Sequence, residues 1–139
     1  MEDHITALLA FTRSEPLHGL AVALANLRIE NWTVRTCGEA ALYLGRQEPP
    51  HLVFTDTQLA DGTWTDILQL AAKALVPLNV IVVSPVVDVE LYIRTIELGA
   101  FDFLVAPVGR EEVSHVVRTA AADVVRRRKD RSAAVSAGG

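Results

Sequence analysis

The sequence lacks the features that would assign it directly to a disulfide-bonded, metal-binding or membrane-spanning class. Its 139 residues include one cysteine, Cys37, so no internal disulfide can form, and no CxxC or Cys/His spacing indicates a zinc site. No apolar run approaches the ~20 residues that span a bilayer, and no basic segment typical of a signal peptide opens the chain. We therefore expect a cytoplasmic domain that does not bind a membrane.

The chain also has no excess of basic over acidic residues. Asp and Glu number 17 against 13 Lys and Arg, which gives a formal net charge of −4. A protein that binds nucleic acid mainly through its phosphates usually has the opposite balance, so we expect no direct nucleic-acid binding. Apolar residues make up 50% of the chain and charged residues 22%, which is enough for the core of one ordinary domain.

Short apolar blocks alternate with segments of helical period. The blocks predict five buried strands, at residues 5–11, 32–37, 52–55, 80–83 and 101–105. Between them, apolar residues recur with the spacing of one helix face, as in the set Val89, Tyr92, Ile93 and Ile96. Because right-handed crossovers place helices on both faces of a parallel sheet, we expect a doubly wound (βα)5 fold with three α/β/α layers.

The end of the chain differs in composition from the rest. Residues 126–129 are Arg-Arg-Arg-Lys, and a small, polar Ser/Ala/Gly segment follows them. We therefore expect one domain over residues 1–125. Residues 126–139 are predicted to form a solvated basic helix end and a flexible tail or linker.

Candidate functional residues follow the predicted strands. In an open parallel sheet, ligands bind at the carboxyl ends of the strands, near the point where the strand order reverses. The residues at these positions are Thr12, Arg13, Ser14, Asp56, Ser84 and Ala106.

From residue 5 to about residue 125, the chain resembles the receiver domains of two-component response regulators. The resemblance rests on the LVFTD run that ends at Asp56, the Leu59-Ala60-Asp61-Gly62 loop, the IVVS run that ends at Ser84, and GAFDFLVAP over residues 99–107. It implies a flavodoxin-like fold with strand order 2-1-3-4-5. It also implies a phosphorelay signalling domain with no catalytic residues of an enzyme, whose partner is a histidine kinase or another signalling protein.

The resemblance further implies roles for single residues. Asp56 matches the phosphoacceptor, Ser84 matches the residue that contacts the phosphoryl group, and Phe103 matches the switch aromatic. Pro107 matches a proline that follows a cis peptide bond.

Two positions depart from the family pattern. Thr12, Arg13 or Ser14 stand where the family has an acidic pair that holds Mg²⁺, and Ala106 stands where it has a lysine. Because Mg²⁺ needs carboxylates, Asp56 alone is a poor metal site, and Glu15 helps only if the first strand ends later than predicted.

We expect Arg13 to replace the metal, with its guanidinium directed at Asp56, because the first and third strands are neighbours in this order. Phosphoryl transfer depends on positive charge placed against the transferred oxygens. The sequence therefore favours an atypical receiver, in which Mg²⁺-dependent aspartyl phosphorylation is impaired or absent and protein–protein interaction carries the signal.

Other interpretations stay open at this point. One alternative is a conventional receiver that is phosphorylated on Asp56, and another is that Asp56 is a structural acid paired with Arg13. A flavodoxin-like small-molecule site is a further alternative, although the loop at residues 12–14 has no glycine. We also expect a homodimer through the fourth helix, fifth strand and fifth helix, whose outward residues mix both charge signs: Tyr92, Arg94, Glu97, Arg118 and Asp123.

Overall fold

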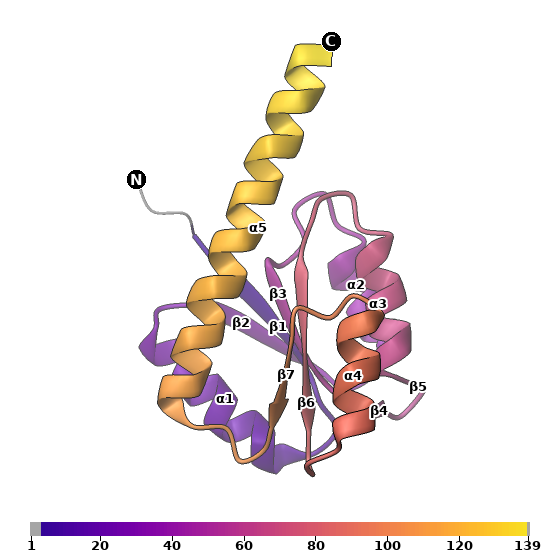
Figure 1. The fold of residues 1–139 in the computed structure, drawn as a ribbon, viewed down its shortest axis with the longest axis vertical. Helices are drawn as coiled ribbons and strands as arrows, with labels where there is room; N and C mark the ends of the chain where they lie inside the picture. Colours follow the sequence, from indigo (N-terminus) through magenta and orange to yellow (C-terminus); the bar gives the residue numbers. More distant parts are fainter. Residues whose placement is uncertain (1–3, 139) are drawn as a thin grey trace.

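A five-stranded parallel sheet forms the centre of the molecule (Figure 1). The computed structural model describes residues 4–138, with side chains as far as residue 134. The strands lie in the order β2-β1-β3-β6-β7, with bounds Glu30–Val34, Thr6–Ala10, Leu52–Asp56, Asn79–Ser84 and Asp102–Val105. Counted along the chain, this is the order 2-1-3-4-5, which confirms the predicted flavodoxin-like fold.

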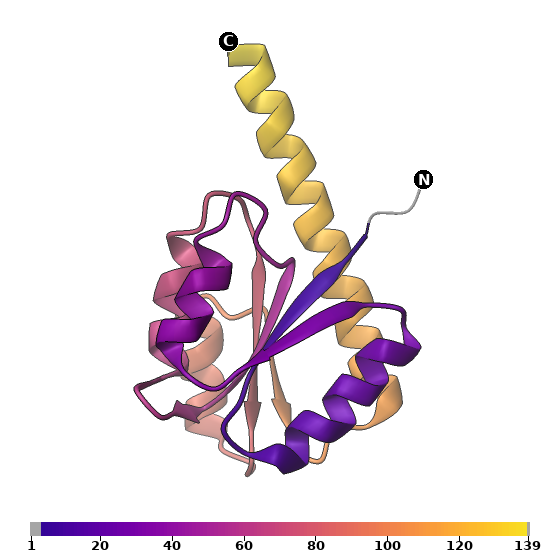
Figure 2. The same cartoon turned by 180° about the vertical axis from the view of Figure 1, so that it is seen from behind.

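Five helices cover both faces of the sheet (Figure 2). They are α1 (Ser14–Asn26), α2 (Cys37–Leu44), α3 (Trp64–Ala72), α4 (Val89–Glu97) and α5 (Arg110–Gly138). Leu9 and Phe54 face one core with α1 and α5, and Leu8 and Val53 face the other with α2 and α3. The central strands β1, β3 and β6 are therefore buried on both sides, as their continuous apolar runs predict, whereas the edge strands β2 and β7 are partly exposed.

The helices begin at the carboxyl edge of the sheet, and most of them have a side-chain cap. The Thr36 hydroxyl accepts a hydrogen bond from Glu39 N at 3.0 Å, and Asp88 accepts one from Leu91 N at 3.0 Å. Arg13 stands at the cap position of α1 but forms no side-chain cap. Its side chain instead reaches across to β3.

A two-stranded hairpin fills the segment after β3, where we expected only turns. It consists of β4 (Gln58–Leu59) and β5 (Gly62–Thr63) and leads into α3.

The apolar face of α4 that the spacing indicates is largely exposed. Val89, Tyr92, Ile93 and Ile96 are 65%, 46%, 48% and 38% exposed. The helix lies over β7 at the edge of the sheet, where only a narrow stripe of it is covered, and the one buried residue of α4 is Thr95.

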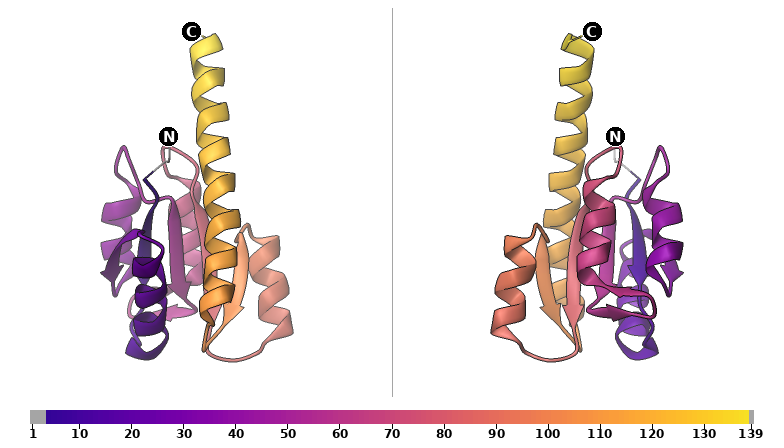
Figure 3. Two further views of the ribbon diagram at one scale, coloured as in Figure 1. Left: turned by 90° about the vertical axis from the view of Figure 1, so that its left-hand side faces the viewer. Right: turned by 90° about the vertical axis from the view of Figure 1, so that its right-hand side faces the viewer.

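The last helix continues past the predicted domain boundary at residue 125. Residues 126–138 are helical and run beyond the sheet (Figure 3), where we expected a flexible tail. Residue 139 lies outside the described part. The expected solvation of the basic run is wrong for Arg127 and Arg128, because both donate hydrogen bonds into the domain. Within residues 4–138, no helix is both long and apolar enough to span a membrane.

Candidate functional site

Asp56 ends β3 at the carboxyl edge of the sheet, and its side chain is 2% exposed. Arg13 forms a two-pronged ion pair with it. Arg13 Nη2 donates to Asp56 Oδ1 at 2.6 Å, and Nε donates to Oδ2 at 2.9 Å. Arg13 lies three residues after the end of β1, which pairs with β3 through Ala10 and Thr55. The predicted approach of Arg13 to Asp56 is therefore confirmed.

Both carboxylate oxygens of Asp56 accept hydrogen bonds. In addition to the two bonds from Arg13, Thr57 N donates to Oδ1 at 2.8 Å. The hydrogen bond to Asp56 raises the pKa of Arg13; desolvation works against this shift and the charge of Asp56 reinforces it. A guanidinium is always charged and its fork matches a carboxylate, so the pair is neutral without a metal ion.

Ser84 ends β6 beside Asp56, but its hydroxyl is engaged in its own loop. Ser84 Oγ donates to Val86 O at 2.7 Å and accepts from Val86 N at 3.2 Å, and the residue is fully buried. This local turn occupies the donor that the receiver resemblance assigns to a phosphoryl group.

The positions after β7 also lie at this edge. Ala106 N donates to Ser84 O at 2.8 Å, and the Ala106–Pro107 peptide bond is cis, as expected. Ala106 places a methyl group where the family has a lysine. Phe103 lies apart from Asp56 and packs edge-on against Tyr92 of α4, with ring centroids 5.7 Å apart.

The residues present do not fit the Mg²⁺ that the resemblance implies. Glu15 is exposed on the first turn of α1, beside a cavity of about 370 Å³ that Pro107 also lines. Asp56 lines a different cavity, of about 540 Å³, together with Thr12. The Arg13 guanidinium holds the carboxylate oxygens that a cation would need, and within residues 4–138 no three acidic, His or Cys side chains gather around a common point. Ser14 is exposed at the start of α1.

Asp61 is a structural residue of this edge that sequence reasoning missed. Its carboxylate accepts from Cys37 N at 2.6 Å and from Gly38 N at 3.0 Å, which fastens the β4–β5 hairpin to the start of α2. These two backbone hydrogen bonds lower the pKa of Asp61. Nothing in the sequence distinguishes Asp61 from an ordinary acid in an exposed turn.

Comparison with known sequences gives one related protein. The response regulator protein PilR of Pseudomonas aeruginosa is 30% identical to this chain over 101 residues. The matched region covers 73% of this chain and 22% of PilR, so the chain spans about a fifth of that relative's length. No protein-family model matches the chain.

Receiver domains are among the solved structures that share this fold. A CheY-like receiver from Methanospirillum hungatei JF-1 superposes with a TM-score of 0.77 at 20% identity, covering 89% of this chain and 98% of that one. A receiver protein from Pseudomonas putida gives 0.73 at 26% identity, covering 86% and 99%. The fold is thus the flavodoxin-like fold of these receiver domains. The chain belongs to the receiver domains of response regulators in two-component signalling.

Proposed function

We propose that this domain is an atypical receiver, which signals through protein–protein contact and is not switched by Mg²⁺-dependent phosphorylation of Asp56. The observation that carries the proposal is the two-pronged Arg13–Asp56 ion pair around an acid that is 2% exposed. The proposed setting is cytoplasmic, and the proposed partner is a histidine kinase or another signalling protein.

The ion pair opposes phosphorylation in two ways. Attack on phosphorus needs a nucleophilic carboxylate oxygen, and the hydrogen bonds from Arg13 to both oxygens of Asp56 lower their nucleophilicity and place the guanidinium against them. The transferred phosphoryl group also needs positive charge beside its oxygens. Ala106 carries none, and the charge of Arg13 is already balanced by Asp56 itself.

Moving Arg13 aside would be costly. Removing one partner of a buried ion pair destabilises a protein by about 3–5 kcal/mol, because the other charge stays buried without compensation. The cost is smaller here, since the Arg13 side chain is 43% exposed and is partly stabilised by water. The closed pair is therefore the favoured state of this edge.

The surface of α4 supports a role in protein contacts. We name the exposed apolar residues of α4 and its flanking loops the α4 apolar face: Val86, Val87, Val89, Tyr92, Ile93, Ile96 and Leu98. Contiguous exposed apolar surface of this kind marks interaction sites. In the proposed homodimer this face, rather than the expected mixed charges, makes the contact, because Asp123 is engaged by Asn79 and Arg127 within its own chain.

Phosphorylation is tested by intact mass after incubation with acetyl phosphate and Mg²⁺. We expect no mass gain for the wild-type chain, while a conventional receiver treated in parallel gains one phosphoryl group. A stoichiometric adduct that disappears in Asp56→Asn would overturn the proposal and establish a conventional receiver. A visible absorption band of the purified protein would instead favour a small-molecule site.

Self-association is tested separately by sedimentation. We expect Ile93→Glu to shift the chain toward monomer. The matched control is Leu42→Glu, which alters an apolar residue that is 72% exposed on α2 and outside the α4 apolar face. A wild-type chain that stays monomeric at high concentration would remove the dimer from the proposal.

A further inference from the structure

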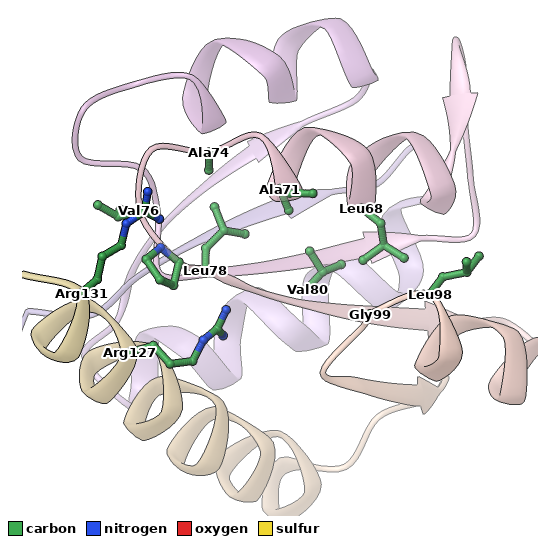
Figure 4. Close-up of a pocket in the computed structure, with 12 residues that line it drawn as sticks. Leu68, Ala71, Ala74, Val76, Leu78, Val80, Leu98, Gly99, Arg127 and Arg131 are labelled. Atoms are coloured by element: carbon green, nitrogen blue, oxygen red, sulfur yellow. The ribbon is translucent and has the colours of Figure 1, made fainter. Parts of the chain in front are cut away.

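A third cavity lies away from Asp56, between α3, β6 and α5 (Figure 4). Its volume is about 260 Å³. Apart from two arginines, its lining side chains are apolar, and polar main-chain and guanidinium atoms supply the rest of its surface. The apolar side chains come from α3, the segment before β6, β6 itself and the loop after α4: Leu68, Ala71, Ala74, Val76, Leu78, Val80 and Leu98.

Two arginines of α5 provide the only charged groups in the lining. Arg127 and Arg131 lie at one end of the cavity, and no acidic residue lines it. Arg127 is held in place because its Nη1 donates to Asn79 Oδ1 at 2.9 Å and to Asp123 Oδ2 at 3.0 Å. Within residues 4–138, its remaining N–H groups make no hydrogen bond. The cavity thus combines apolar side chains with an end formed by two guanidinium groups. Of these, Arg127 is paired with Asp123 and keeps free N–H donors, and Arg131 forms no ion pair among the described residues.

We propose that this cavity binds a small organic carboxylate with one apolar chain. The chain would pack against Leu68, Leu78 and Val80, and the carboxylate would be recognised by the guanidinium groups of Arg127 and Arg131. An apolar cavity of about 150 Å³ suffices for a benzene molecule, so the observed volume leaves room for a ring or a short alkyl chain. Few, well-placed polar groups in an apolar pocket are typical of small-molecule sites.

The site is independent of the chemistry at Asp56. Its lining includes α5 and the loop after α4, and Leu98 belongs both to the cavity and to the α4 apolar face. An occupant would therefore contact elements on both sides of β6 without involving the Arg13–Asp56 pair. The inference stands whether or not Asp56 accepts a phosphoryl group.

Binding is tested by titrating the ¹⁵N-labelled chain with octanoate and following its amide resonances. We expect saturable shifts concentrated at Leu68, Val80 and Leu98. Arg131→Gln should weaken binding about tenfold, as expected for loss of one hydrogen-bonded charge. Ala71→Leu, which fills the cavity, should abolish it. The matched control is Arg118→Gln, which removes an exposed arginine of the same helix outside this cavity and should leave the affinity unchanged.

Three results would overturn the proposal. The first is the absence of saturable shifts, and the second is a set of shifts that lies elsewhere on the surface. The third is equal affinity for octanoate and for uncharged octanol, which would show that the arginines do not recognise the ligand. Because Arg131 is exposed, its substitution does not threaten the fold, and the charge test holds even if Ala71→Leu fails to fold.

Discussion

An arginine fastens each end of the central sheet, but the two arginines meet different partners. At the carboxyl edge, Arg13 binds the carboxylate of Asp56, which is a full negative charge. At the amino edge, Arg128 binds main-chain carbonyl groups only: Nε donates to Pro77 O at 2.7 Å, and Nη2 donates to Pro50 O at 3.1 Å and Pro49 O at 3.2 Å.

The pKa values of the two arginines shift in opposite directions. The hydrogen bond to Asp56 raises the pKa of Arg13, whereas burial lowers that of Arg128 and the distant charge of Glu48 compensates only in part. One edge uses a cation to neutralise an acid, and the other uses a cation to link loops to α5. An arginine can therefore neutralise a buried acid or link loops to a helix, depending on whether its guanidinium contacts a carboxylate or main-chain carbonyl dipoles.

Breaking the carboxyl-edge pair should produce the largest effect. Arg13→Leu leaves Asp56 buried without a counter-charge, and we expect the free energy of unfolding to fall by about 2 kcal/mol at neutral pH. Urea denaturation measures this change. In Arg13→Leu/Asp56→Asn, most of the loss should be recovered, because no unpaired charge remains. Equal losses in the single and double variants would show that Arg13 contributes packing only.

Breaking the amino-edge contacts should have a smaller effect. Arg128→Met keeps the apolar stem but removes three hydrogen bonds to carbonyls, so we expect a loss of about 1.5 kcal/mol. Circular dichroism should also show less helix, as the part of α5 beyond the sheet loses its anchor. Arg126→Met is the matched control, because the Arg126 side chain is 63% exposed and its ion pairs lie within α5. Equal losses in both variants would contradict a special role for Arg128.

The sequence predicts the fold well where local pattern and neighbouring strands decide the outcome. Apolar runs and helical spacing are local, so the strands and helices follow from them. The strand order follows from the resemblance to receiver domains, and the pairing of Arg13 with Asp56 follows from that order. The period of α4 shows that one side is apolar but not whether another element covers it. Val89 and Ile93 are therefore exposed, although their spacing matches that of core residues.

The contacts that the sequence does not predict join residues far apart in the chain. Arg128 binds carbonyls 51 to 79 positions away, and Asp61 binds an amide 24 positions away. Every residue has a main-chain carbonyl, so the sequence does not show which carbonyls accept these hydrogen bonds. The contact of Ser84 is local instead. Its hydroxyl donates a hydrogen bond to Val86, two residues away in its own loop, so the donor is not free for a distant group.

The smallest expected effect is a pH dependence of stability that comes from Cys37. Its thiol lies near Asp61 and Asp66, two acids of the carboxyl edge that Arg13 does not neutralise. Burial, with the charges of Asp61 and Asp66, raises the pKa of the Cys37 thiol from 9.0 to about 11. Between these two values the thiol ionises in the unfolded chain but not in the folded one. Cys37 therefore lowers the free energy of unfolding as the pH rises through this window.

The pH dependence of alkylation by iodoacetamide measures this shift directly, because the thiolate is the reacting form. In the folded chain the rate should keep rising to about pH 11, whereas in urea it should level off near 9. Simple burial would slow the reaction at every pH but would not move the midpoint. Asp61→Asn removes one of the two acids and should lower the midpoint of the folded chain. An unchanged midpoint in that variant would mean that the charge of Asp61 does not contribute to the raised pKa of Cys37.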